Sequence, residues 1–173
     1  MPLNTKVGAH LPYAEPEYRS ELEQSSLEAI WTLLEARGIV RVHQQELIGI
    51  CLWKFTEAGN VPRTNKYGTR FRSRGALDVE NPSDVNHEHV GTRKWLRAEI
   101  MTRYCEKAGR EAIERFIRDH AVACVVTKEE HSRLSSLAQE LQGWQRYAAA
   151  NVEVIDMLTG MPFDTAAAVP ARI

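Results

Sequence analysis

The chain has 173 residues, of which 43% are hydrophobic and 26% are charged, and its formal net charge is −1. These values are ordinary for a globular protein with a single well-packed domain. The longest apolar run, AVACVV at 121–126, is far too short to span a membrane, and the N-terminal sequence has no apolar signal-peptide core. The composition therefore argues against a membrane partner.

The three cysteines are Cys51, Cys105 and Cys124, which form no CxxC pair and cannot all be disulfide-bonded within one chain. This usage favours a reducing cytoplasm and excludes a zinc ribbon. Cys105 and Cys124 have no activating neighbours in the sequence, so we interpret them as buried small hydrophobic residues.

Two amphipathic helices are predicted in the first third of the chain. The first runs from Pro16, which suits a first helical turn, to about Arg37, and Gly38 ends it. The second spans about Val42 to Ala58 and ends at 59. Their apolar positions recur at helical spacing and are Leu27, Ile30, Trp31 and Leu34 in the first helix, and Ile48, Cys51, Leu52 and Phe55 in the second.

A basic segment follows these helices. Residues 54–74 contain Lys54, Arg63, Lys66, Arg70, Arg72 and Arg74 against the single acid Glu57. In YGTRFRSR the arginines occupy alternate positions, so an extended conformation would gather them on one face. Clustered cations of this kind favour phosphate binding, with Arg70 and Arg72 as contacts. The alternative is a solvated edge strand whose charges serve solubility.

The middle of the chain predicts a strand, two helices and a second strand, followed by a helix. DVNHEHV is the first strand, Thr92 caps a helix over 93–108, a second helix covers 110–119, and AVACVV is a buried strand. Thr127 and Glu130 then have the spacing of a capping box. His131 lies three residues before the apolar Leu134, so we expect it to point inward.

Two strands that pair would bring His131 of the last helix towards His87, Glu88 and His89 of the first strand. Imidazole and carboxylate groups are ligands for divalent transition metals and, with water completing the shell, for magnesium. The alternatives are a surface pair of histidines and a core His131 bonded to a backbone carbonyl.

The strand–strand–helix order, the acid–histidine pair in EHV and the phrase VVTKEEHSRL resemble the HNH, or ββα-metal, nucleases. The resemblance covers about 84–135, roughly a third of the chain. It implies metal-dependent hydrolysis of nucleic acid, with DNA as the expected substrate. The expected cofactor is a divalent ion, either Mg²⁺ or a transition metal such as Zn²⁺, Mn²⁺ or Ni²⁺.

Carried over by position, the resemblance makes His89 the general base, and Glu88 and His131 the metal ligands, with His87 as a further ligand. Arg93 and Lys94, directly after the motif, would contact neighbouring phosphates, with Arg70 and Arg72 as a second row.

Two positions depart from the family pattern. Val122 stands about where the central Asn is expected, with His120 as a candidate substitute, and Gly91 and Thr92 replace the proline that often follows the base. The missing Asn favours an alternative function: a non-catalytic helical interaction or inhibitor protein, with a protein partner, that retains a nuclease-like framework.

The sequence thus predicts an α+β protein that is predominantly helical, with a central two-stranded ββα-metal unit. Its expected organisation is an N-terminal helical region with the basic extended segment (1–83), the HNH-like unit with a helical insertion (84–142), and a C-terminal segment and tail (143–173). Residues after 143 are expected to form either a helix or a helix–strand pair. GWQRY at 143–147 loosely resembles a stretch that follows some HNH motifs.

Overall fold

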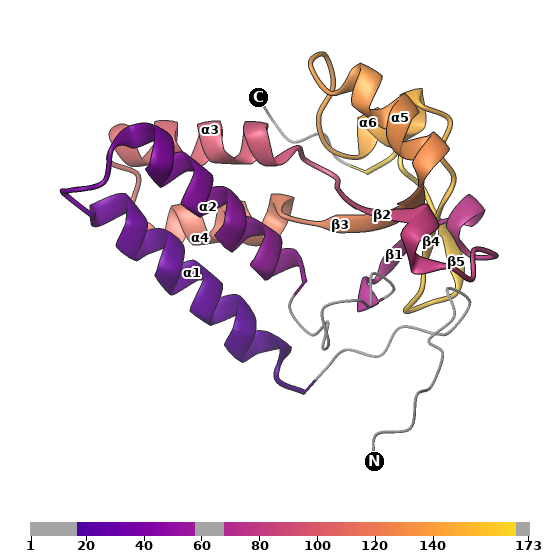
Figure 1. Ribbon diagram of the computed structural model, residues 1–173, viewed down its shortest axis with the longest axis horizontal. Helices are drawn as coiled ribbons and strands as arrows, with labels where there is room; N and C mark the ends of the chain where they lie inside the picture. Colours follow the sequence, from indigo (N-terminus) through magenta and orange to yellow (C-terminus); the bar gives the residue numbers. More distant parts are fainter. Residues whose placement is uncertain (1–16, 58–67, 169–173) are drawn as a thin grey trace.

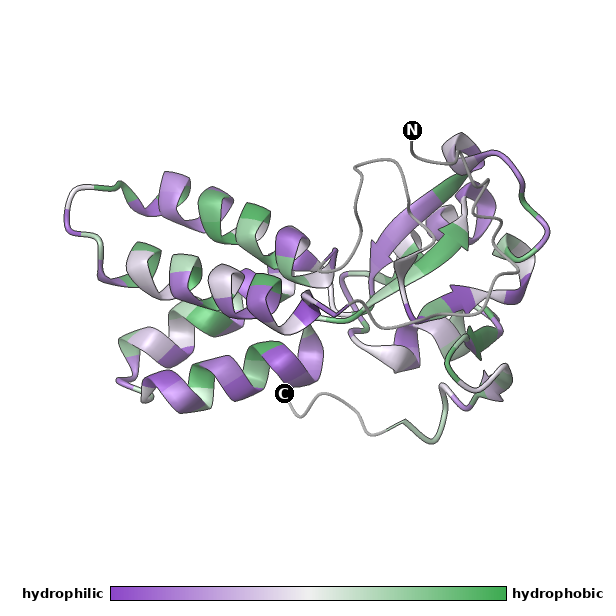
Figure 2. Cartoon of the chain, turned by 90° about the horizontal axis from the view of Figure 1, so that it is seen from below, coloured by the Kyte–Doolittle hydropathy of each residue, from purple (hydrophilic) through white to green (hydrophobic). Residues whose placement is uncertain are grey.

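The computed structural model describes residues 17–57 and 68–168. It is an α+β structure in which helices α1–α4 pack together beside a sheet covered by α5 and α6 (Figure 1). We call these two parts the helical body and the sheet body. Figure 2 shows them side by side, with helices that are polar on one side and apolar on the other. None of the helices in the described ranges combines the length and apolar composition of a transmembrane span.

The helical body consists of α1 (Arg19–Glu35), α2 (Arg41–Thr56), α3 (Arg93–Cys105) and α4 (Arg110–His120). All four helices were predicted, and Thr92 caps α3 as expected, because its side chain accepts from the Trp95 N–H. The predicted start at Pro16 and the predicted end at 58–59 lie outside the described residues. The core of the helical body combines residues from the first two predicted regions, 1–83 and 84–142. It contains Leu27, Ile30, Leu34, Ile48, Leu52, Phe55, Leu96, Ile100, Met101, Ile113, Phe116, Ile117 and Ala121.

Within the described residues the sheet has five strands, so the two predicted strands belong to a larger sheet. The strands are β1 (Phe71–Ser73), β2 (Val85–His89), β3 (Ala123–Thr127), β4 (Val154–Asp156) and β5 (Met161–Phe163), in the spatial order β2-β3-β1-β4-β5. β1 is parallel to β3, and the other neighbouring pairs are antiparallel. β1 is therefore the central strand, and the edge-strand interpretation of the basic segment is wrong.

The predicted pairing of the histidine-bearing strand with the apolar strand is confirmed. β2 runs antiparallel to β3, with Glu88 opposite Cys124 and His89 opposite Ala123. β2 is an edge strand of the sheet. The chain passes directly from β3 into α5 (Lys128–Leu137), which contacts both strands.

Alternation along the strands gives the sheet two distinct faces. Cys124 and Val126 pack with Leu134 of α5 and Tyr147 of α6 (Trp144–Ala149), and we call this side the α5 face. Val125 packs instead with Ala76 and Val85 on the opposite side, which we call the α2 face because it looks towards α2. The short 3₁₀ turns Arg74–Ala76 and Pro82–Asp84 lead from β1 to β2.

All three cysteines are free thiols, and their environments differ. Cys124 is buried, Cys51 is half-buried and Cys105 is exposed, so the expected burial of Cys105 is wrong. Burial raises the pKa of the Cys124 thiol well above its usual range, which makes it an unreactive core residue.

The capping box that starts α5 is expected to contribute measurably to stability. The Thr127 hydroxyl accepts from the Glu130 N–H at 3.1 Å, and the Glu130 carboxylate accepts from the Thr127 N–H at 2.8 Å. Thr127→Ala should lower the free energy of unfolding by about 1 kcal/mol and the melting temperature by about 2–4 °C in a thermal scan. Ser132→Ala, an exposed change on the same helix, is the control and should leave the melting temperature unchanged.

Candidate functional site

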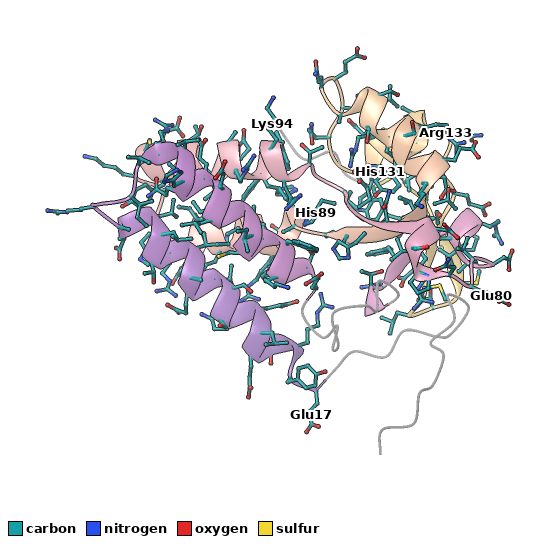
Figure 3. All side chains as sticks on the ribbon, in the orientation of Figure 1. Glu17, Glu80, His89, Lys94, His131 and Arg133 are labelled. Atoms are coloured by element: carbon teal, nitrogen blue, oxygen red, sulfur yellow. The ribbon has the colours of Figure 1, made fainter. Side chains whose placement is uncertain are left out.

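Strand β2 divides the NHEH sequence between the two faces of the sheet. Successive side chains of a strand point to opposite sides. Glu88 therefore lies on the α5 face, where it contacts α5 and α6, whereas His87 and His89 lie on the α2 face, where both contact Thr56. Figure 3 shows His89 beside the helical body and His131 on the α5 side of β2. The structure brings Glu88 together with His131, but it does not bring His87 or His89 to that pair.

On the α5 face, Glu88 is held between a histidine and an arginine. Its Oε2 lies 2.7 Å from His131 Nδ1, and its Oε1 accepts from Arg146 Nη2 at 2.7 Å. The same Nη2 donates to the carbonyl oxygens of His89 at 2.5 Å and Val90 at 3.2 Å. Glu88 is 9% exposed and Arg146 only 1% exposed, so these two residues form a buried ion pair. His131 is the third member of the cluster and is accessible to solvent.

His131 is the accessible member because 42% of its side chain is exposed, which only partly agrees with the predicted inward direction. It stands in the first turn of α5, whose start is fixed by the capping box. Glu130 of that box also accepts from the Ser73 hydroxyl of β1 at 2.5 Å. The first turn of α5 is thus tied to β1 by Glu130 and to β2 by His131.

The contact with Glu88 fixes which ring nitrogen of His131 faces the carboxylate, namely Nδ1. When the neutral ring donates its Nδ1 proton to Glu88, the lone pair resides on Nε2. A carboxylate that orients an imidazole in this way is common both in general-base sites and behind metal-binding histidines. The pair can therefore accept a proton or share a cation.

The donor set suits a hydrated cation rather than a closed metal centre. Within residues 17–57 and 68–168, no three or more His, Cys, Asp or Glu side chains gather as a metal-binding group. Arg146 already donates to Glu88 Oε1, so the two available ligands would be Glu88 Oε2 and His131 Nδ1, with the His131 ring in the tautomer that carries its proton on Nε2. Magnesium commonly keeps several waters and takes few protein ligands, whereas structural zinc requires four.

On the α2 face, two imidazoles converge on one hydroxyl group. Thr56 Oγ1 lies 3.0 Å from His87 Nε2 and 3.1 Å from His89 Nε2, and it is 2.9 Å from the Trp53 carbonyl oxygen. Thr56 is itself 7% exposed. The contact links the C-terminal end of α2 to the edge strand of the sheet.

The His89 ring is buried in a positively charged environment. Burial lowers the pKa of His89 to about 3, the neighbouring His87 and Arg93 side chains lower it further, and a hydrogen bond to the Leu52 backbone opposes the effect. His89 is therefore neutral at physiological pH. An imidazole with so low a pKa is a poor proton acceptor, since a general base works best with a pKa near the working pH.

The predicted phosphate contacts are dispersed. Arg93 is exposed and lies over the Trp53 ring, with its guanidinium carbon 5.7 Å from the ring centroid, and Lys94 is exposed at the start of α3. Arg70 is exposed but makes a bidentate ion pair with Asp156 at 2.8 and 2.5 Å. Arg72 is 1% exposed, so the alternating arginines do not form a surface row.

His120 lies in the helical body, so it does not replace the missing Asn beside Glu88. Its ring centroid is 4.7 Å from that of Phe116 and 5.7 Å from that of Trp95. Burial lowers its pKa. His120 therefore acts as an aromatic packing residue.

Sequence reasoning missed two members of these clusters, Arg146 and Thr56. Arg146 lies in the GWQRY stretch, whose loose resemblance to sequences following HNH motifs was the available signal. Thr56 ends a helix and had no signal at all. Comparisons of the chain with protein-family models, with curated proteins and with solved structures find no match.

Proposed function

We propose that the protein hydrolyses nucleic-acid phosphodiester bonds with the help of a divalent cation held at Glu88 and His131. The observation that carries the proposal is the 2.7 Å approach of Glu88 Oε2 to His131 Nδ1, which joins an edge strand to a helix 43 positions later in the chain. An acid and a histidine on these two elements are what the resemblance to ββα-metal nucleases implies for the ligands.

In this proposal each residue has a separate task. A bound cation would neutralise charge on the attacked phosphate and on the leaving oxygen. Glu88 and His131 would hold it, with the neutral His131 ring carrying its proton on Nε2 so that the Nδ1 lone pair is free for the cation. Arg146 keeps the Glu88 carboxylate in place, and Arg93 and Lys94 contribute positive charge at the start of α3 for the nucleic-acid backbone.

The test is cleavage of plasmid and single-stranded substrates by the purified protein with Mg²⁺, Mn²⁺, Ni²⁺ or Zn²⁺, with and without a chelator. We expect cleavage that depends on the cation. His131→Ala and Glu88→Gln should abolish both the cleavage and any rise in melting temperature caused by the cation. His43→Ala, which replaces an exposed histidine of α2, is the matched control and should retain both.

A second candidate is a non-catalytic interaction protein that keeps this framework. It is favoured by the state of His89, the residue assigned as base by the resemblance, which is 7% exposed and has a pKa near 3. This candidate predicts no cleavage with any cation and no difference between His89→Ala and the parent protein. Cation-dependent cleavage that is lost in His89→Ala would exclude this second candidate. It would also require Thr56 to move away from the His89 ring, because its hydroxyl group now contacts Nε2.

A further inference from the structure

A cleft lies between the helical body and the sheet, where β1 and β3 begin. Its volume is about 310 Å³, which lies at the lower end of the range of small-molecule sites. The walls come from the start of α1, the end of α2, the start of β1 and the α4–β3 junction. The polar residues of its lining are Arg19, Glu23, Thr56, Thr69, Arg70 and Arg118.

Positive charge dominates the lining of this cleft. Arg19, Arg70 and Arg118 come from three separate elements, and Glu23 is the carboxylate among the lining residues. Arg70 is oriented by its bidentate pair with Asp156, which lies outside the lining. Among the described residues, Arg19 pairs with Glu23 and Arg70 pairs with Asp156.

Arg118 is the cation best placed to exchange its present contacts for a ligand. It lies 3.4 Å from Glu23 and 3.2 Å from Gln24, both at the long end of hydrogen-bond distances, and its side chain is 43% exposed. Arg19, by comparison, is bonded to Glu23 at 2.7 Å. Planar guanidinium groups recognise phosphate through paired N–H donors, and a lining with few competing acids favours such an anion.

The remaining lining combines hydroxyl groups with apolar surface. Thr56 and Thr69 are 7% and 4% exposed, and Thr56 connects the cleft to His87 and His89. Phe55 and residues 121–123 supply apolar contacts. A site of this size, lined by arginines together with apolar side chains, fits a phosphate attached to an organic group better than a free inorganic anion.

We infer that this cleft binds a phosphorylated organic ligand of nucleotide size, with Arg118 as a phosphate contact. Neither Glu88 nor His131 is among the residues that line this cleft, so binding here requires neither the cation nor cleavage. A free mononucleotide and the phosphorylated end of a strand present the same chemistry to this site.

The experiment is isothermal titration of the full chain in the presence of a chelator. The probes are a nucleoside 5′-monophosphate, its parent nucleoside, inorganic phosphate and a 5′-phosphorylated oligonucleotide. We expect the monophosphate to bind more tightly than the nucleoside or inorganic phosphate. Tighter binding of the oligonucleotide than of the monophosphate would identify a strand end as the ligand, and the reverse order would identify a free nucleotide.

Three variants locate the binding. Arg118→Gln should lower the affinity for the monophosphate by about ten- to a hundredfold, because it removes a charge-assisted contact. Glu23→Gln should tighten it, since it removes a carboxylate that competes for Arg19 and Arg118. Arg115→Gln, an exposed change on the same helix and outside the cleft, should bind like the parent. No binding of any phosphorylated probe, or an unchanged affinity in Arg118→Gln, would overturn the inference whether or not the protein cleaves nucleic acid.

Discussion

Replacement of Arg146 by alanine is expected to lower the free energy of unfolding by about 3–5 kcal/mol, which is the typical cost of removing one partner of a buried ion pair. The guanidinium group is 1% exposed and donates to Glu88 and to the carbonyl oxygens of His89 and Val90. Its loss would leave a buried carboxylate and two buried carbonyl groups without this donor. Urea denaturation followed by circular dichroism measures the effect.

Arg133→Ala is the matched control for this change. Arg133 lies on α5, is 44% exposed and pairs with Glu129 at 3.0 Å, which is an exposed i,i+4 pair of small energetic value. Figure 3 shows its side chain pointing away from His131. The control should change stability by less than about 0.5 kcal/mol. Equal stability of Arg146→Ala and Arg133→Ala would show that the buried pair is not needed for folding.

A double variant separates the cost of the unpaired charge from the cost of lost packing. Glu88→Leu combined with Arg146→Met removes both charges and keeps apolar volume at both positions. Because the desolvation of the two charges is then no longer required, it should recover much of the stability lost in Arg146→Ala. It should also lose the proposed cation site. If the double variant is stable but no longer binds the cation, the Glu88–Arg146 pair serves function rather than stability.

The elements of this fold were predictable where a local signal was strong. The apolar spacing of Leu27, Ile30 and Leu34 identified α1, and the Thr127–Glu130 capping box fixed the start of α5. Strands β4 and β5 have three residues each, which is too short for a periodicity to emerge, and β5 was not predicted. β1 is central because it pairs with β3 and β4, which are distant in sequence. No local pattern indicates such pairing, so the alternating arginines suggested an exposed edge strand.

The candidate site was predictable only in part for the same reason. The approach of His131 to Glu88 followed from the order of strand, strand and helix. Glu88 and His89 lie on opposite faces of the sheet because successive side chains of a regular strand alternate. This could be concluded only once β2 was known to pair regularly along its whole length. Arg146 reaches Glu88 across 58 positions, and no local pattern in the sequence reports such a contact.

Acidification is expected to destabilise the protein through His89. Its pKa is about 3 in the folded protein, against about 6.5 for an unperturbed histidine. Between these values the unfolded chain binds a proton that the folded protein does not, so the free energy of unfolding decreases as the pH falls. This contribution is absent above pH 6.5. It grows by about 1.4 kcal/mol per pH unit below that value, and it approaches about 4–5 kcal/mol near pH 3.

The measurement compares urea denaturation of the parent and of His89→Gln at pH 7.5, 6.5, 5.5 and 4.5. Carboxylates titrate in both proteins, so the difference between the two curves isolates the histidine. Glutamine cannot be protonated in this range, so the parent should lose about 2–3 kcal/mol more than the variant between pH 7.5 and pH 4.5. His43→Gln, which changes an exposed histidine, should follow the parent curve. Parallel curves for the parent and His89→Gln would mean that the His89 ring is protonated as readily in the folded protein as in the unfolded chain, and that its burial does not keep it neutral.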